Sequence, residues 1–176
     1  MANYDCAMKN TILSLCLLLL VTSTRANDLV EISKSIVINV HQEAVFDHVK
    51  DTTNDHTWRN EVNSMTADGD FEVGTRYTED AHIGLQRNFI TTTVLKELQD
   101  LQLAYYETPQ DAKYFLSSSR NVERLNDRQT LFTYIVKFDP KMSKETLGQY
   151  YSIGFLKLSY GLIMNFYLNN LKNYLE

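Results

Sequence analysis

One carboxylate–imidazole pair in this sequence has the spacing that proton transfer would need. Asp80 and His82 stand two residues apart in a segment of strand-like composition, so both side chains fall on one face of the strand. Such a pair can act as acid and base, for example in proton abstraction from a polyketide-like substrate. Polar residues that face solvent explain the same spacing. Residues 117–119 are serines without the glycine-flanked turn of a nucleophile elbow. We therefore assign no catalytic residue and leave open whether the chain is an enzyme.

A second polar group contains residue types that bind metals. His48, Asp51, Asp55 and His56 lie close together in the sequence. The two histidines are separated by a helix break at a distance that matches no standard zinc spacing, and the chain has no His-Glu-x-x-His motif. A helix end with surface polar residues accounts for the group. We predict neither a metal nor a cofactor.

Two single residues are candidates for contact with a ligand. Trp58 is the only tryptophan, and at the mouth of a cavity it would offer a large aromatic face; the alternative is a core residue that packs a helix onto a sheet. Arg76 follows a Val-Gly-Thr turn and begins a strand. It could face an acidic group of a ligand, or it could be an exposed strand arginine.

Most of the chain between residues 31 and 138 has the composition of β-strands. Segments rich in Thr, Tyr, Phe, Val and Ile, joined by short polar connections, favour an antiparallel meander. The predicted strands are 31–40, 75–83, 86–98, 102–107, 114–125 and 130–138. Two short helices follow the first strand, one at 41–50 and one that runs through Trp58 and Glu61. Alternation in the last strand turns one face toward the interior: Phe132, Tyr134, Val136 and Phe138.

A long apolar helix is predicted from Lys144 to Leu175, and its apolar residues form two stripes. We expect the first stripe to line the interior with the aromatic strand face: Leu147, Tyr151, Phe155, Leu158, Leu162 and Phe166. We expect the second stripe to face outward, available to a twin subunit or a membrane surface: Ile153, Leu156, Tyr160, Ile163, Tyr167 and Leu171. Residues 150–168 would make a poor membrane span, because they contain Lys157 and several polar residues.

The first 26 residues have the features of a secretory signal. Residues 11–22 are apolar but short for a bilayer, and the small residues around Arg25 predict cleavage after Ala26. A start at Met8 would give a cleaner signal; an uncleaved anchor or a lipoprotein is the alternative. Cleavage would remove both cysteines and leave one domain, residues 27–176, without thiol chemistry. We expect an exported protein, in the periplasm or outside the cell.

The overall charge argues against one class of partner. The chain carries a net charge of −5 at pH 7, and no predicted element contains a basic cluster. Nucleic-acid affinity depends on lysine and arginine that neutralise phosphates. We therefore predict no nucleic-acid binding.

The order of elements, together with several short motifs, resembles a known superfamily. The motifs are Val-Ile-Asn-Val at 37–40, the helix at 41–51, Trp58, the Val-Gly-Thr-Arg turn at 73–76 and the terminal helix. They are similar to the START-like, or SRPBCC, helix-grip proteins, and the polyketide cyclase/dehydrase-like branch looks closest. The resemblance implies an α+β fold with a seven-stranded antiparallel sheet wrapped around the C-terminal helix and a cavity between them. Members bind lipids, sterols, isoprenoid quinones, polyketides or plant hormones, and some catalyse cyclisation.

Three functions follow as hypotheses. The first is an exported protein that holds an apolar or amphipathic ligand in the cavity, in contact with Trp58, Arg76, Phe132, Tyr134, Val136, Tyr151, Phe155, Leu158 and Leu162. The second is a cyclase or dehydrase that acts in the same cavity. The third is an interaction module that forms a homodimer or touches a membrane through the outer face of the last helix, with Ile153, Leu156, Tyr160, Ile163 and Tyr167.

Overall fold

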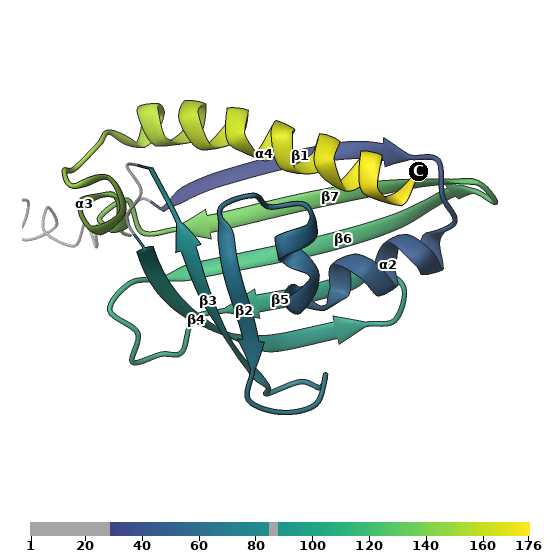
Figure 1. Cartoon of the computed structure of the whole chain (residues 1–176), viewed down its shortest axis with the longest axis horizontal. Coiled ribbons are helices and arrows are strands. Elements are labelled where there is room, and N and C mark those ends of the chain that lie inside the picture. The colour runs from purple at the N-terminus through teal and green to yellow at the C-terminus, as the bar shows by residue number, and fades with distance from the viewer. Residues whose placement is uncertain (1–28, 85–87) are drawn as a thin grey trace, which may run out of the picture.

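The computed structural model (Figure 1) describes residues 29–84 and 88–176. The expected signal and its cleavage point at Ala26 lie outside the described residues. In chain order the elements are β1 (Val30–Ile38), α2 (Gln42–Lys50), the 3₁₀ helix η1 (Thr52–Thr57), β2 (Val62–Ala67), β3 (Arg76–His82), β4 (Asn88–Gln99), β5 (Leu103–Glu107), β6 (Leu116–Asn126), β7 (Gln129–Phe138), α3 (Met142–Leu147) and α4 (Ile153–Leu175).

Seven antiparallel strands form one sheet in the order β1-β7-β6-β5-β4-β3-β2. The first strand pairs with the last, from Val30 opposite Phe138 to Ile38 opposite Thr130. Bulges shift the register in β2, β4 and β6, and such bulges bend a sheet. Figure 1 shows β2 and β3 running steeply across the direction of β6 and β7. The predicted seven-stranded helix-grip architecture is confirmed.

Helix α4 lies along β1 and covers the concave face of the sheet (Figure 1). The Ser152 side chain caps its first turn by accepting a hydrogen bond from the Phe155 amide at 3.3 Å. The main core between α4, α2 and the sheet contains Trp58, Phe132, Tyr134, Val136, Leu156, Met164, Tyr167, Leu168 and Leu171. The predicted interior face of the last strand is therefore confirmed.

Two element boundaries differ from the sequence prediction. The second short helix ends at Thr57, and the chain reaches β2 at Val62, a strand for which the pattern provided no range. The long C-terminal helix is interrupted: α3 ends at Leu147, and the C-cap residue Gly148 has a φ of 84°, in the left-handed region that favours glycine. Within the described residues, no helix has the length and apolar character needed to cross a membrane.

Candidate ligand-binding site

An apolar cavity of about 380 Å³ lies between α3, the first half of α4 and the end of β3. We call it the main cavity. Most of its walls are hydrophobic: Ile83, Phe138, Met142, Leu147, Tyr151, Phe155, Leu156, Tyr160 and Ile163. Gly84, Ser143, Thr146 and Ser159 complete the lining. This size and lining suit a small apolar molecule.

The turn between β7 and α4 positions one wall of the main cavity. Asp139 accepts a hydrogen bond from the Lys141 amide at 2.8 Å and so begins the turn into α3. The Ser143 hydroxyl donates to the Pro140 carbonyl at 2.7 Å and accepts from the Tyr151 amide at 3.3 Å. These bonds tie the segment around Gly148 back onto α3 and hold Tyr151 at the cavity.

Gly84 brings the opposite wall close to α3. Its φ of 78° is left-handed, and a Cβ placed there would lie 2.2 Å from a methyl carbon of Leu147. Only glycine allows the end of β3 to approach α3 so closely without strain. The close approach narrows the main cavity between these two elements.

A smaller cavity of about 230 Å³ adjoins the main cavity; its walls are mostly apolar and include several polar side chains. Four residues border both: Ile83, Gly84, Tyr160 and Ile163. The smaller cavity adds Asn60, Glu61, His82 and Tyr167. The two cavities together form a mostly apolar site; we call the end with Asn60, Glu61 and His82 the polar end.

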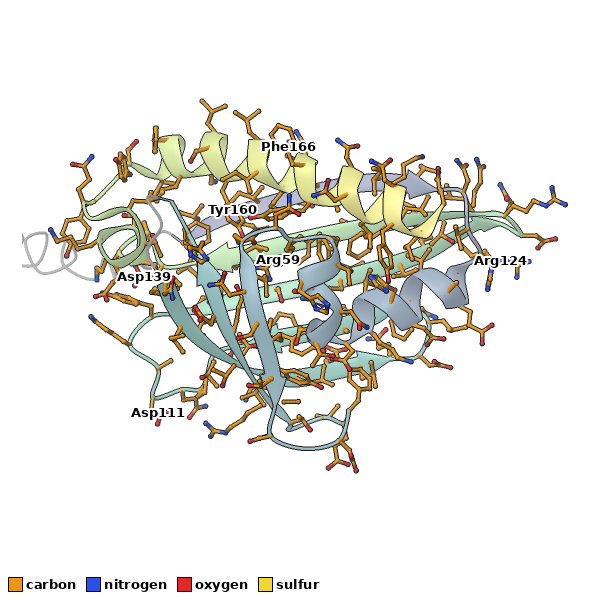
Figure 2. The ribbon with its side chains drawn as sticks, viewed as in Figure 1. Arg59, Asp111, Arg124, Asp139, Tyr160 and Phe166 are labelled. Atoms are coloured by element: carbon orange, nitrogen blue, oxygen red, sulfur yellow. The ribbon has the colours of Figure 1, made fainter. Side chains whose placement is uncertain are left out.

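Two tyrosines of α4 stand between the cavities and the core. The ring of Tyr160 lies 5.7 Å from that of Phe138 and 6.4 Å from that of Tyr167. Figure 2 shows Tyr160 on the sheet side of the helix, near Arg59. Burial raises the pKa of Tyr160 and of Tyr167, so both hydroxyls stay protonated at neutral pH.

Beneath the polar end lies a cluster of buried charges that sequence reasoning missed. Arg59 donates to Asp55, Glu61 and Glu79 over distances of 2.8 to 2.9 Å. Burial alone would lower the pKa of Arg59, but Glu79 and the other carboxylates outweigh it and hold this pKa well above its ordinary value. Strand alternation could have indicated that Glu79 points inward, because Glu79 lies on the same face of β3 as Tyr77 and Ala81, which are both buried.

Asp55 joins this cluster to a second buried arginine. Arg120 donates to its two carboxylate oxygens at 2.9 and 2.6 Å and to the Val49 carbonyl at 2.8 Å. Both oxygens of the Asp55 carboxylate thus accept hydrogen bonds from guanidinium groups, so this carboxylate is not an open metal ligand. His48 bonds to Thr57 instead, and the described residues include no group of three or more metal-ligating side chains.

The predicted binding residues fall into different places. Tyr151 and Phe155 line the main cavity. Trp58 is fully buried and makes edge-on contacts with Phe132 and Tyr134, at centroid distances of 6.2 and 5.4 Å, so it lies in the core and away from any cavity mouth. Four further residues do not border either cavity: Arg76, which is exposed, and Phe132, Tyr134 and Val136, which pack in the core.

Beyond Tyr151, the two stripes of the last helix face the opposite way from the prediction, whereas Leu147 and Tyr151 of the first stripe line the main cavity as expected. Leu158 and Leu162, expected inside, are exposed, as are Phe155 and Phe166, at 47% to 69% of their surface. Residues expected outside are buried or half-buried: Ile153, Leu156, Tyr160, Tyr167 and Leu171; Ile163 is 40% exposed and borders both cavities. The orientation follows from the apolar surface area that each face can bury. Met164 and Leu168 extend the second stripe, so this stripe is the broader apolar face and packs on the sheet.

The Asp80–His82 pair does not form a hydrogen bond between its own members. Both side chains bond to Asn63 instead, His82 at 2.5 Å and Asp80 at 3.3 Å. His82 borders the smaller cavity, whereas Asp80 lines neither cavity. The acid–base interpretation of this pair therefore gains no support from the geometry.

Comparison with known proteins places this fold among solved structures. No family model and no curated protein matches the sequence. The structure is similar to a START superfamily protein from Mycobacterium smegmatis, with a TM-score of 0.64 and 12% identity over 82% of this chain and 96% of that one. It is also similar to the di-domain ARO/CYC protein BexL from the BE-7585A biosynthetic pathway, with a TM-score of 0.63 and 12% identity over 87% of this chain and 52% of that one. A protein from Thermobifida fusca gives a TM-score of 0.58 and 18% identity over 81% of this chain and 91% of that one. The chain has the START/SRPBCC helix-grip fold.

Proposed function

We propose that this helix-grip chain binds a small apolar or amphipathic molecule in the main cavity. The observation that carries the proposal is the apolar lining of that cavity between α3, α4 and the end of β3. The similarity to START superfamily and ARO/CYC proteins supports it at the level of the fold. Extraction of the protein purified from its own cells, followed by mass spectrometry, would identify a resident ligand.

A cavity-filling variant tests the same proposal in vitro. Ser159 lines the main cavity, and Asn165 is exposed on the same helix. We expect Ser159→Trp to weaken binding of the fluorescent probe N-phenyl-1-naphthylamine about tenfold or more, because the indole occupies the space of the probe. Asn165→Trp is the matched control and should bind normally. Unchanged affinity in a folded Ser159→Trp protein would show that the main cavity is not the binding site.

The exposed face of α4 favours a second role, docking on an anionic lipid surface. Phe155, Leu158, Leu162 and Phe166 follow one another at helical spacing on one exposed face, which we call the outer stripe. Figure 2 shows Phe166 on the side of α4 away from Arg59. Residues 141–175 carry four lysines and one glutamate, whereas the whole chain has a net charge of −5. An apolar stripe on a locally basic segment complements a negatively charged bilayer.

Flotation with vesicles tests this role. We expect the protein to float with vesicles that contain phosphatidylglycerol and less with pure phosphatidylcholine. Leu158→Glu combined with Leu162→Glu should abolish flotation, and Asn169→Glu, exposed on the same helix, should not. A concentration-dependent dimer that the double variant disrupts, without any flotation of the parent protein, would instead assign the outer stripe to a second copy of the chain.

Export is a further proposal, supported by the apolar residues 11–22 and the small residues before Asn27. Intact-mass measurement of the protein recovered from its own cells would test it. A mature chain that begins at Asn27 is the expected result. A full-length chain in the cytoplasmic fraction would contradict it.

A further inference from the structure

The face of β1 that packs toward α4 contains one charged residue, Lys34. The other side chains on this face are aliphatic: Val30, Ile32, Ile36 and Ile38. The residue opposite Lys34 on the neighbouring strand β7 is Tyr134, so the sheet supplies no carboxylate there. No salt bridge of residues 29–84 and 88–176 includes Lys34. An otherwise apolar strand face thus carries a cation for which the described part of the chain provides no counter-ion.

Gly161 of α4 provides the space in which the Lys34 side chain lies. A Cβ at position 161 would be 3.5 Å from Lys34 Cε and 3.9 Å from Lys34 Nζ. Gly161 is buried and Lys34 is half-buried, so the apolar stem of the lysine packs on the helix and leaves its ammonium group at the side of α4. Gly161 directly precedes Leu162 and follows Leu158 by three residues. The Lys34 ammonium group is therefore held beside the outer stripe.

Helix α4 adds a second cation on the same side and no acidic residue. Its 23 residues contain two lysines, Lys157 and Lys172, and neither aspartate nor glutamate. Lys172 donates to the Val37 carbonyl at 2.7 Å and pairs with Glu176, so it is already bonded. Lys157 is exposed and lies four residues before Gly161, one turn away on the same side of the helix. Lys34 and Lys157 thus flank the outer stripe along one edge.

The two features of this surface require one partner that is both apolar and anionic. The outer stripe exposes four large apolar side chains, which gain free energy only when they leave water. The lysine edge gains from a negative charge placed beside that stripe. A phospholipid in a bilayer presents its phosphate directly above its acyl chains, in the order that this surface needs. A dissolved anion would satisfy the lysines alone and leave the apolar stripe in water.

We propose that Lys34 and Lys157 form a binding site for the phosphate of an anionic phospholipid in a bilayer, beside the outer stripe. This proposal rests on the proposed docking of α4 on an anionic lipid surface. It goes beyond that role, because it assigns a specific headgroup contact to a residue of β1 that lies outside the helix. It also gives Gly161 a reason, since a larger residue there would occupy the space of the Lys34 side chain.

Partition into vesicles of mixed phosphatidylglycerol and phosphatidylcholine, measured by sedimentation, tests the site. We expect Lys34→Gln and Lys157→Gln each to lower the partition coefficient about fivefold. Lys96→Gln, at an exposed lysine of β4, makes the same change in net charge and should lower it less than about twofold. A relocation variant, Lys34→Gln with Ser33→Lys, restores the net charge on the opposite, exposed face of β1. It should bind as weakly as Lys34→Gln alone.

The outcomes separate the headgroup site from the docking role. If the parent protein does not bind these vesicles, both proposals fail. If it binds and the Lys34 and Lys157 variants bind equally well, the headgroup site is overturned while the docking role stands. Recovery of binding in the relocation variant also overturns the site, because net charge would then be sufficient. If Lys34→Gln does not fold, Lys157→Gln decides by the same criterion, because Lys157 is exposed.

Discussion

Replacing Asp55 with asparagine would remove the carboxylate on which both buried arginines depend. Asp55 is fully buried and accepts one hydrogen bond from Arg59 and two from Arg120. Arg59 keeps two other carboxylate partners, but Arg120 keeps only the Val49 carbonyl. The variant therefore leaves a buried guanidinium without a counter-charge.

The expected loss is large for a single substitution. Breaking one side of a buried ion pair costs about 3–5 kcal/mol, because the remaining charge stays buried. At about 2–4 °C per kcal/mol for a domain of this size, Asp55→Asn should lower the melting temperature by about 6–20 °C. Arg120→Met combined with Asp55→Asn should cost less than the single change, because it removes the stranded charge as well.

Urea denaturation followed by tryptophan fluorescence measures this loss. Trp58 is the only tryptophan and is fully buried, 5.9 Å from the Arg120 guanidinium, so its emission reports on this part of the core. Asp47→Asn is the control, because Asp47 is exposed and pairs only with Lys50; its expected cost is below about 1 kcal/mol. If Asp55→Asn costs no more than this control with an unchanged m-value, the cluster does not stabilise the fold as argued.

Three further predictions concern pH and backbone. Burial lowers the pKa of His48 below its ordinary value of 6.5, so the stability that neutral His48 contributes is complete above pH 6.5 and is lost as the pH falls toward the lower pKa of the folded state. Between about pH 7.5 and pH 5.5, His48→Gln should therefore lose less free energy of unfolding than the parent protein. Equal losses in the two proteins would contradict this. Gly84→Ala should destabilise by about 1–3 kcal/mol and exceed the cost of Gly74→Ala, where φ is also positive, at 107°, but no atom lies within 4 Å of an added Cβ; equal costs in thermal melts would refute the contact argument. Gly161→Ala should stabilise α4 by about 0.5–1 kcal/mol, because a Cβ there meets only ordinary contacts, and a lowered melting temperature would show tighter packing than the structure indicates.

The site was predictable only in part from the sequence. Tyr151 and Phe155 were expected at a cavity and line it. Glu61, which borders the polar end, was expected only as the end of a short helix, because nothing in its neighbourhood shows that β2 begins one residue later. Arg59 and Arg120 resemble ordinary surface arginines until the strands that carry their partners are placed.

The sequence by itself determined the periodic features of this protein. Alternation in residues 130–138 defined the buried strand face, because alternation depends on neighbours along the chain. The sheet that grips a helix was implied by the resemblance that the order of elements and the short motifs carry. The tertiary structure alone decided which stripe of α4 is buried. A helix with two apolar stripes has no local reason to prefer either, and the choice depends on how much area each one buries against β1 and β7. The tertiary structure also decided that the charges of residues 55–61 meet those of residues 79 and 120. These ion pairs join segments that are distant in sequence and depend on strand register, so no residue spacing in the sequence indicates them.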